Sequence, residues 1–221
     1  MTARDQILGT IRHSLGATGA EAPRARAVAD RLAHHPAGVT LALARVEGEA
    51  RLALFRDKVL ASAASFARVG SIHEVAAEVA RHLRANNLPA TIRRGADRRL
   101  AAVDFRGSAI EASEGASDGH DLNGLSCAFA GVAETGTLAL LAGPANPTTL
   151  NFLPDNHIVV AMAGDVVGDL ESLWAKLRAA RPEGPSRAVN LVTGPSRSAD
   201  IEQTLLLGAH GPRSLHVIVV G

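Results

Sequence analysis

The sequence has 221 residues, a formal net charge of +1 from 23 Lys and Arg against 22 Asp and Glu, and 47% hydrophobic residues. This composition is typical of a soluble globular chain with one sizeable core. The balanced charge and the 3% aromatic content exclude the concentrated basic face and the stacking platforms of a nucleic-acid-binding protein. No apolar stretch of about 18 residues is free of Gly, Pro and charge, so we expect no membrane span.

The N-terminus and the cysteine content predict the compartment. Residues 1–15 carry Arg4, Asp5 and Arg12 and lack the apolar central run of a secretory signal. Cys127 is the single cysteine, so it forms neither an internal disulfide nor a CxxC metal site, and its apolar surroundings predict a buried, inert thiol. We therefore expect a cytoplasmic protein. It cannot bind an iron–sulfur cluster by itself, since such clusters need several thiolates.

The first third of the chain has helical periodicity. Ile7, Ile11 and Leu15 form one narrow apolar stripe, residues 16–23 have the composition of a linker, and a longer helix is predicted for residues 47–66. Such stripes need a surface to pack against, either the core domain or a second copy of the chain. Residues 1–66 are therefore predicted to be an N-terminal helical extension and are our candidate for homo-oligomer contacts.

From residue 67 to residue 221 we predict one α/β core domain, because apolar strands alternate with amphipathic helices. Strands are predicted at residues 91–93, 108–112, 125–133, 137–142, 157–163, 189–193 and 215–220. Helices are predicted at residues 72–83, 165–180 and 198–207. Ser198 is the expected N-cap of the last helix and Gly208 its end. The alternation favours a mostly parallel sheet with helices on both faces.

Four ordered sequence blocks carry a resemblance to a known family. They are AETGTL at residues 133–138, LPxxHI at 153–158, GPSRSADIE at 194–202 and GxHGPRxLHVI at 208–218. Together they resemble the LUD-domain family, in particular its lactate-utilisation protein C members. The family usually has Thr where this chain has Ser198, and both are good N-caps.

The resemblance implies a fold similar to the NagB/RpiA/CoA-transferase group. It also implies a role in the oxidation of L-lactate to pyruvate beside iron–sulfur partner proteins, which would hold the clusters. It does not imply a known catalytic act for this chain.

Glu134 is the candidate catalytic residue. An acidic side chain between two apolar strands is costly to bury unless it is paired or has a function. Glu134 is predicted at the carboxyl end of a strand, where ligands bind in doubly wound sheets. In the related fold group, CoA-transferases use a Glu as a covalent nucleophile and isomerases use carboxylates as bases. Alternatively, Glu134 caps a turn or pairs with an Arg.

The turn that follows Glu134 is a candidate anion-binding segment. Thr135, Gly136 and Thr137 could offer backbone N–H groups and hydroxyls to an anion. A tight turn between two strands would equally explain a Gly between two Thr residues.

Two further candidates lie in the C-terminal region. Ser196 and Arg197 precede the predicted helix, so an anion would meet a guanidinium and a helix N-terminus together. Asp200 already occupies that positive end and favours a structural ion pair with Arg197. His210 lies beside a turn, as does His157, and a histidine near neutral pH can act as acid, base or ligand.

Other motifs limit the function classes. Asp118, His120 and Asp121 form only a loose cluster, so we predict a solvated loop and no metal site. The sequence lacks GxGxxG, Walker A and GxSxG motifs, so no cofactor is expected on this chain alone.

Three functional hypotheses remain. The first is a component of an L-lactate utilisation system with a small-anion-binding or accessory role. The second is a self-standing transferase or isomerase acting on CoA esters or sugar phosphates, with Glu134 as nucleophile or base. The third is a non-catalytic scaffold or binding module.

Overall fold

The fold is described by a computed structural model, which covers residues 2–18, 21–199, 205–207 and 210–221. The chain divides into two compact units, Met1–Val39 and Thr40–Gly221. Within the described part of the chain, no helix is long and apolar enough to cross a bilayer.

The N-terminal unit holds the helices α1 (Ala3–Leu15) and α2 (Ala22–His34), and none of their residues is buried. Thr2 begins α1 through a capping box with Asp5, which satisfies backbone N–H groups that have no partner inside the helix. The predicted apolar stripe of α1 is exposed, with Ile7 at 61%. That this stripe mediates contacts between copies of the chain stays a prediction.

The larger unit contains four α-helices among its described residues. They are α3 (Gly48–Ala61), α4 (Val75–Ala85), α5 (Thr148–Phe152) and α6 (Leu170–Ala180). Its strands are β1 (Ser65–Val69), β2 (Thr91–Arg94), β3 (Glu111–Glu114), β4 (Asn123–Cys127), β5 (Ala130–Val132), β6 (Thr137–Leu141), β7 (Asn156–Met162), β8 (Val166–Val167), β9 (Val189–Val192), β10 (Arg197–Ala199), β11 (Leu205–Leu207) and β12 (Ser214–Val220).

A parallel six-stranded sheet forms the centre of this unit, in the order β1-β12-β7-β4-β2-β3. All of its strand pairs are parallel, which confirms the predicted architecture. In β7, Ile158 and Val160 pack into the core beneath α4, whereas Val159 and Ala161 pack into the core on the opposite face. Both faces are therefore buried, and this is why residues 158–162 of β7 and 217–220 of β12 are continuously apolar.

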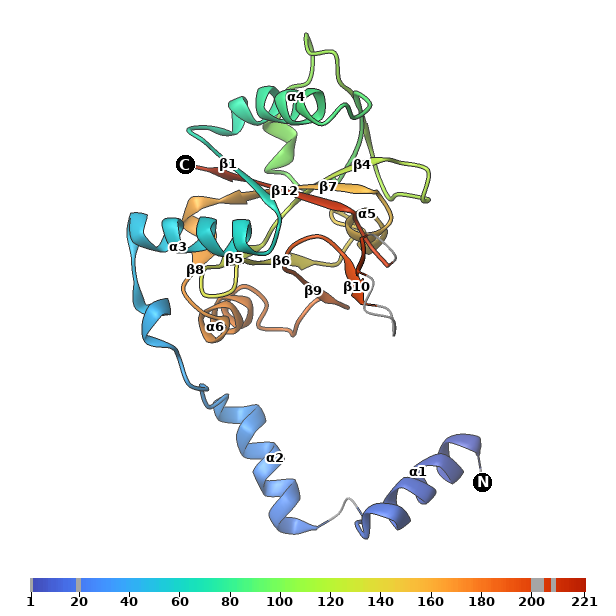
Figure 1. Cartoon of the computed structure of the whole chain (residues 1–221). Helices are drawn as coiled ribbons and strands as arrows, with labels where there is room; N and C mark the ends of the chain where they lie inside the picture. Colours follow the sequence, from blue (N-terminus) through green and yellow to red (C-terminus); the bar gives the residue numbers. More distant parts are fainter. Residues whose placement is uncertain (1, 19–20, 200–204, 208–209) are drawn as a thin grey trace. The chain divides into compact units, whose positions relative to one another are not determined.

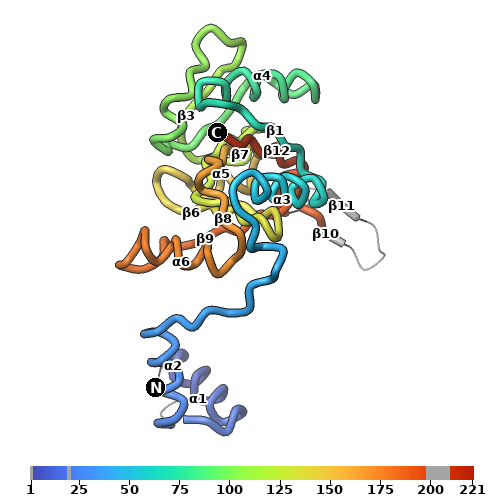
Figure 2. Tube along the Cα trace, turned by 90° about the vertical axis from the view of Figure 1, so that its left-hand side faces the viewer, coloured from blue at the N-terminus to red at the C-terminus, as the bar shows by residue number. Residues whose placement is uncertain are grey.

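The unit has four layers (Figure 1). The helix α4 covers one face of the parallel sheet, and α3 covers the other face together with a second sheet of order β8-β5-β6-β9. The helix α6 packs on the outer side of this second sheet through Leu173. Figure 2 shows the same layers after a quarter turn.

The second sheet corrects the prediction of a single strand over residues 125–133. The N–H of Ala128 donates to Val160 O at 2.8 Å in the parallel sheet, whereas the N–H of Phe129 donates to Ala139 O at 2.8 Å in the second sheet. The chain thus leaves one sheet and enters the other between adjacent residues. No polar residue marks the change, because both sheets are buried there.

The helix predicted at residues 198–207 is wrong at its described positions. Arg197–Ala199 and Leu205–Leu207 form an antiparallel hairpin, in which Ser198 pairs with Leu206. Ser198 is therefore part of a strand ladder rather than an N-cap, and tertiary pairing overrides the local capping pattern. Residues 200–204 and the predicted helix end at Gly208 lie outside the described residues.

The domain boundary predicted at residue 66 is also corrected, since the compact unit begins at Thr40. The helix α3 belongs to the core, because Phe55 and Val59 are 0% and 1% exposed. Residues 65–66 belong to β1, which pairs with β12. Two surfaces were predicted as possible partners for the apolar stripe of α3, and the stripe packs against the core domain.

Candidate functional site

Glu134 lies at the end of β5, in the second sheet rather than the parallel one. Its Oε1 accepts a hydrogen bond of 3.0 Å from the backbone N–H of Leu170, the first residue of α6. Its own N–H donates to Gly168 O at 3.0 Å. A half-buried carboxylate at a helix N-terminus accepts from a backbone N–H that has no partner inside the helix, and it interacts favourably with the positive end of the helix dipole. This geometry agrees with the capping alternative. Glu134 does follow the carboxyl end of a strand, but that strand, β5, belongs to the second sheet and not to the parallel one.

The turn after Glu134 packs against α3. Gly136 has a φ of 71°, and its N–H donates to Val132 O at 2.9 Å. A Cβ at this position would lie 2.7 Å from both the Lys58 carbonyl carbon and the Val59 nitrogen. Gly136 is therefore required by the close approach of the turn to the helix backbone, and its N–H is used within the turn. Anion binding by this segment stays a prediction.

The flanking threonines link this turn to the chain that follows β9. The Oγ1 of Thr137 lies 2.7 Å from Thr135 Oγ1 and 2.7 Å from Thr193 Oγ1. Thr193 in turn lines a cavity of about 230 Å³ at the amino ends of β7 and β12, which we call the His157 cavity. The predicted anion-binding turn at residues 135–137 is thus connected to the wall of this cavity by the contact between Thr137 and Thr193.

The His157 cavity brings together two of the predicted ligand-binding residues. Ser196 and His210 both line it. Arg197 is exposed on β10 and is not among the lining residues. The expected partner of Arg197, Asp200, lies outside the described residues.

Close backbone approaches hold the walls of the cavity in place. The Ser196 N–H donates to Pro212 O at 2.8 Å, which joins the two loops. A Cβ at Gly194, whose φ is 72°, would collide with the Ser62 carbonyl oxygen. A Cβ at Gly124 would lie 2.9 Å from Leu150 O, so α5 lies directly on β4. The short helix therefore presents its last residues to the middle of that strand.

Three buried side chains form a hydrogen-bonded chain beside the cavity, which we call the polar relay. The Ser126 hydroxyl donates to Asn151 Oδ1 at 2.9 Å, and His157 Nε2 lies 3.0 Å from Ser126 Oγ. These three residues are at most 1% exposed. Burial lowers the pKa of His157 to about 3, so its ring is neutral at physiological pH.

The two ends of the polar relay have no partner among the described residues. Asn151 Nδ2 and His157 Nδ1 are buried and make no hydrogen bond there. Both residues line the His157 cavity. A buried polar atom without a partner costs about 1–3 kcal/mol, so the polar relay is the place beside this cavity where the hydrogen bonding of the described residues is incomplete.

In the sequence, His157 is a histidine beside a turn, and no motif singles out Ser126 or Asn151. Ser126 lies within an apolar run, and Asn151 lies in a five-residue helix without a clear period. A signal was present in each case, because a polar residue in a run that is otherwise buried needs a partner.

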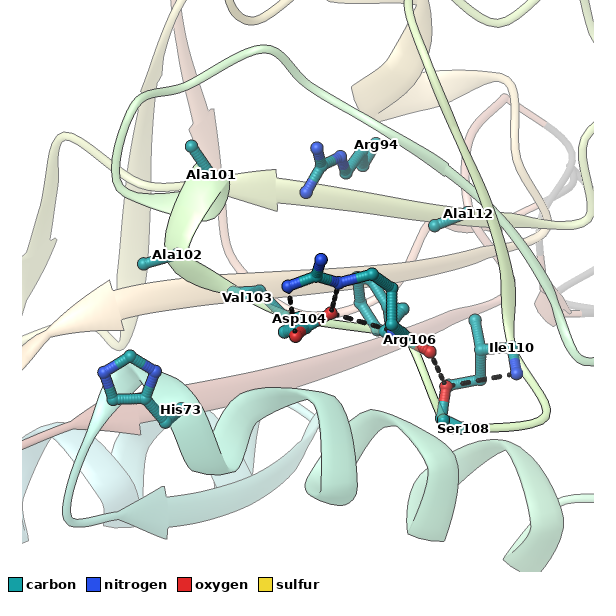
Figure 3. A pocket seen from close by; sticks show the side chains of 12 residues that line it. His73, Arg94, Ala101, Ala102, Val103, Asp104, Arg106, Ser108, Ile110 and Ala112 are labelled. Atoms are coloured by element: carbon teal, nitrogen blue, oxygen red, sulfur yellow. Dashed lines mark hydrogen bonds and ion pairs between the residues drawn. The ribbon is translucent and has the colours of Figure 1, made fainter.

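A more open cavity of about 800 Å³ lies beside α4 and is shown in Figure 3. Its charged side chains are largely paired: Arg106 bonds Asp104 at 2.9 Å, and Arg94 lies 3.3 Å from Glu114. None of the unpartnered buried atoms found in the described residues belongs to its lining. The His157 cavity is therefore the stronger candidate site.

Cys127 lines another cavity, of about 280 Å³, together with Arg99. The guanidinium of Arg99 is already bonded to Asp97, Asp165 and the Ala128 carbonyl oxygen. Burial raises the pKa of the Cys127 thiol to about 12. The predicted burial of this cysteine is confirmed, and a protonated thiol is a poor nucleophile.

The loose acidic cluster lies in an exposed loop. His120 Nδ1 is 3.2 Å from Asp118 Oδ1, and both side chains are at least 75% exposed. Within the ranges that the structure describes, no three His, Cys, Asp or Glu side chains converge as metal ligands.

Comparisons with known proteins converge on the C-terminal part of the chain. Residues 122–220 match the family profile described as the LUD domain. Lactate utilization protein C from Geobacillus sp. (strain WCH70) is 37% identical over 92 residues, which cover 40% of this chain and 38% of that protein. An uncharacterized protein from Neisseria meningitidis serogroup B is 35% identical over 97 residues, or 44% of this chain and 41% of that protein. The chain thus spans about two fifths of the length of these curated relatives.

A solved structure shares the fold. The crystal structure of a DUF162 family protein from Deinococcus radiodurans superposes with a TM-score of 0.60 at 23% identity. The superposition covers 80% of this chain and 99% of that chain. The polar relay and the walls of the His157 cavity lie within the matched range of residues 122–220.

Proposed function

Since residues 122–220 match the profile of the LUD domain, we propose that the protein is a component of an L-lactate utilisation system in the cytoplasm. The observation that carries the proposal is the similarity of this domain to proteins named lactate utilization protein C, at 37% identity for the Geobacillus sp. relative. The His157 cavity lies in the same range of residues and supplies a place for a small ligand.

The proposed component acts beside iron–sulfur proteins. Oxidation of L-lactate to pyruvate releases two electrons and two protons, which need an acceptor. This chain has one cysteine, and its thiol is buried, whereas an iron–sulfur cluster needs several thiolates. The electrons would therefore pass to clusters in partner proteins. The exposed apolar side chains of α1 and α2, the latter including Val28 and Leu32, are the proposed contact surface for a second copy of the chain.

The rival hypothesis is a self-standing transferase or isomerase with Glu134 as nucleophile or base. The hydrogen bond from the Leu170 N–H to Glu134 Oε1 favours the accessory role, because this carboxylate already has a structural partner. A non-catalytic scaffold would need neither Glu134 nor the His157 cavity.

Growth on L-lactate as the sole carbon source separates these hypotheses. A strain without this gene should fail to grow, and both the wild-type gene and Glu134→Gln should restore growth. Growth of the deletion strain would overturn the lactate role. Rescue by wild type but not by a stably folded Glu134→Gln protein would instead support the transferase or isomerase, since a catalytic carboxylate cannot be replaced by an amide.

A further inference from the structure

Three side chains form a second hydrogen-bonded chain, between the parallel sheet and α4. Ser65 is the first residue of β1, and His216 lies opposite it in the register of β12. His216 Nδ1 is 2.7 Å from Ser65 Oγ, and His216 Nε2 is 3.1 Å from Glu78 Oε1 on α4. We call these three residues the Ser65 triad. His216 is buried, whereas Ser65 is exposed, so the triad leads from the interior to the surface.

The charge of Glu78 determines where the protons of the triad lie. Arg81 Nε donates to Glu78 Oε2 at 2.7 Å. Although burial raises the pKa of Glu78, this bond and the charge of Arg81 hold that pKa below its ordinary value, so the carboxylate is ionised at neutral pH. An ionised carboxylate only accepts hydrogen bonds, so Nε2 of His216 carries the ring proton and donates to it.

The other ring nitrogen of His216 is therefore an acceptor that faces the serine. Burial lowers the pKa of His216 to about 4, so its ring is neutral and Nδ1 carries no proton at neutral pH. The Ser65 hydroxyl donates to Nδ1 at 2.7 Å, whereas the alternative acceptor, the Leu215 carbonyl oxygen, is 3.4 Å away. A serine that donates to a neutral histidine, which in turn donates to a carboxylate, is the proton arrangement of an activated nucleophile.

The ring of His216 is held in this orientation. His82 of α4 stacks on it, with the two ring centroids 3.9 Å apart and the ring planes at 12°. Both ring nitrogens are hydrogen-bonded and one face is covered, so the ring needs no rearrangement to take the proton of Ser65. The two nitrogens have exchanged the places that they usually have in serine hydrolases, which leaves the proton transfer unchanged.

The position of Ser65 on an edge strand leaves room for a reacting group. In the parallel sheet, β1 lies at the end of the strand order and pairs only with β12. Every second backbone N–H of an edge strand points away from its partner strand. Among the described residues, none of the N–H groups of residues 65–67 donates to a backbone oxygen outside this ladder. The open side of β1 therefore offers a donor for a developing oxyanion.

We propose that Ser65 is a nucleophilic serine that accepts an acyl group from an ester or thioester, with His216 as its general base and Glu78 as the residue that positions His216. Ser65 lies outside the three cavities described above, so the acyl donor approaches from solvent. The inference does not rest on the proposed lactate role, and it concerns residues outside the His157 cavity.

The step is an acyl transfer that changes no oxidation state. Ser65 Oγ bonds to the carbonyl carbon while its hydroxyl proton passes to His216 Nδ1. The charge of Glu78 stabilises the imidazolium that forms. The bond between the carbonyl carbon and the leaving alcohol or thiol then breaks, and the leaving group takes the proton from Nδ1. The acyl group remains on Ser65 as an ester, which water can cleave by the same route.

A serine-directed probe tests the nucleophile on the unmodified full-length chain. The protein is incubated with a fluorophosphonate at neutral pH, and the modified residues are identified by peptide mass spectrometry. Ser71 is the internal control, because its hydroxyl also donates to a carboxylate oxygen, Glu74 Oε1 at 2.9 Å, without an intervening histidine. We expect Ser65 to react at least about 100-fold faster than Ser71, the usual gain from a general base.

The pH dependence of this labelling tests the base. The titratable groups that face His216 from α4 are Glu78, Arg81 and His82, and the neighbour in β7, Ile158, carries no charge. Burial also lowers the pKa of His82. Both rings therefore stay neutral from pH 7 to 9, and the rate should be nearly constant. An unassisted serine would instead react about tenfold faster per pH unit, in step with its alkoxide fraction.

A pair of variants tests the carboxylate. In Glu78→Gln the amide cannot balance the charge of the imidazolium, so the labelling of Ser65 should fall at least about 100-fold. Glu74→Gln is the matched control and should leave it unchanged. Urea unfolding shows whether both variants are folded, and the comparison of Ser65 with Ser71 in the wild-type chain does not depend on them.

Each outcome decides one part of the proposal. Labelling of Ser65 no faster than that of Ser71 would overturn the nucleophile and leave the Ser65 triad as a structural network. A rate that rises about tenfold per pH unit would overturn the role of His216 as base. Unchanged labelling in a folded Glu78→Gln protein would overturn the positioning role of Glu78. Fast, pH-independent labelling that is lost in Glu78→Gln and kept in Glu74→Gln would support all three roles.

Discussion

The replacement of Gly136 by Ala tests whether the turn after Glu134 is structural. The φ of 71° at Gly136 costs an L residue about 1–2 kcal/mol. The new Cβ would also lie 2.7 Å from backbone atoms of Lys58 and Val59, which cannot move as a side chain can. Overpacking of this kind costs about 1–3 kcal/mol. We therefore expect Gly136→Ala to lower the free energy of unfolding by about 2–5 kcal/mol.

Gly107 provides the matched control. Its φ of 80° is also in the left-handed region, but a Cβ there would have no atom within 4 Å. Gly107→Ala should therefore cost only the conformational part, about 1–2 kcal/mol. The effect of Ala on the unfolded chain is similar at both positions and cancels in the comparison. The difference between the two variants isolates the close approach to α3.

Urea denaturation followed by circular dichroism measures both variants. With a slope of about 2 kcal/mol per M, the extra cost of about 1–3 kcal/mol lowers the midpoint of Gly136→Ala by about 0.5–1.5 M below that of Gly107→Ala. Equal midpoints would refute the packing argument and would return Gly136 to the candidates for ligand binding.

Three further predictions concern other parts of the same unit. Glu134→Gln should change the free energy of unfolding by less than about 0.5 kcal/mol, because the amide oxygen of Gln still accepts from the Leu170 N–H. Glu134→Ala removes this acceptor and should lower the free energy of unfolding by about 1 kcal/mol. Equal losses for the two variants in urea denaturation would contradict the capping role. Burial lowers the pKa of His216 to about 4 from an unfolded value near 6.5, so the unfolded chain binds more protons between these values. As the pH drops from 7 to 4, His216 should therefore contribute on the order of 3 kcal/mol to a loss of stability to which His157 also contributes, and His216→Asn should reduce the loss by about that amount. The same free energy of unfolding at both pH values would refute this. Because the pKa of Cys127 is raised, iodoacetamide should modify this thiol at pH 8 only when the protein is unfolded in urea. Rapid modification of the native protein, detected by mass spectrometry, would contradict this prediction.

The sequence alone predicted the central sheet because its signals are local. Strands buried on both faces need continuous apolar runs, and the runs in β7 and β12 are present in the printed sequence. The helix α4 has its apolar residues at helical spacing, so its face toward the sheet was also predictable. The buried thiol of Cys127 followed from its apolar neighbours for the same reason.

Only the tertiary structure decided where the chain changes sheets and which residues form the site. The transition between Ala128 and Phe129 leaves no local mark, because a strand in either sheet is equally apolar. The hairpin at Ser198 results from pairing with residues that a local capping pattern does not consider. The need for glycine at position 136 depends on a helix that is distant in the sequence.

The polar relay shows the same limit most clearly. Ser126, Asn151 and His157 come from β4, α5 and β7, and each by itself is one polar residue in a buried segment. A sequence pattern records neighbours along the chain, whereas a hydrogen-bonded site depends on distances of about 3 Å between segments that only folding brings together.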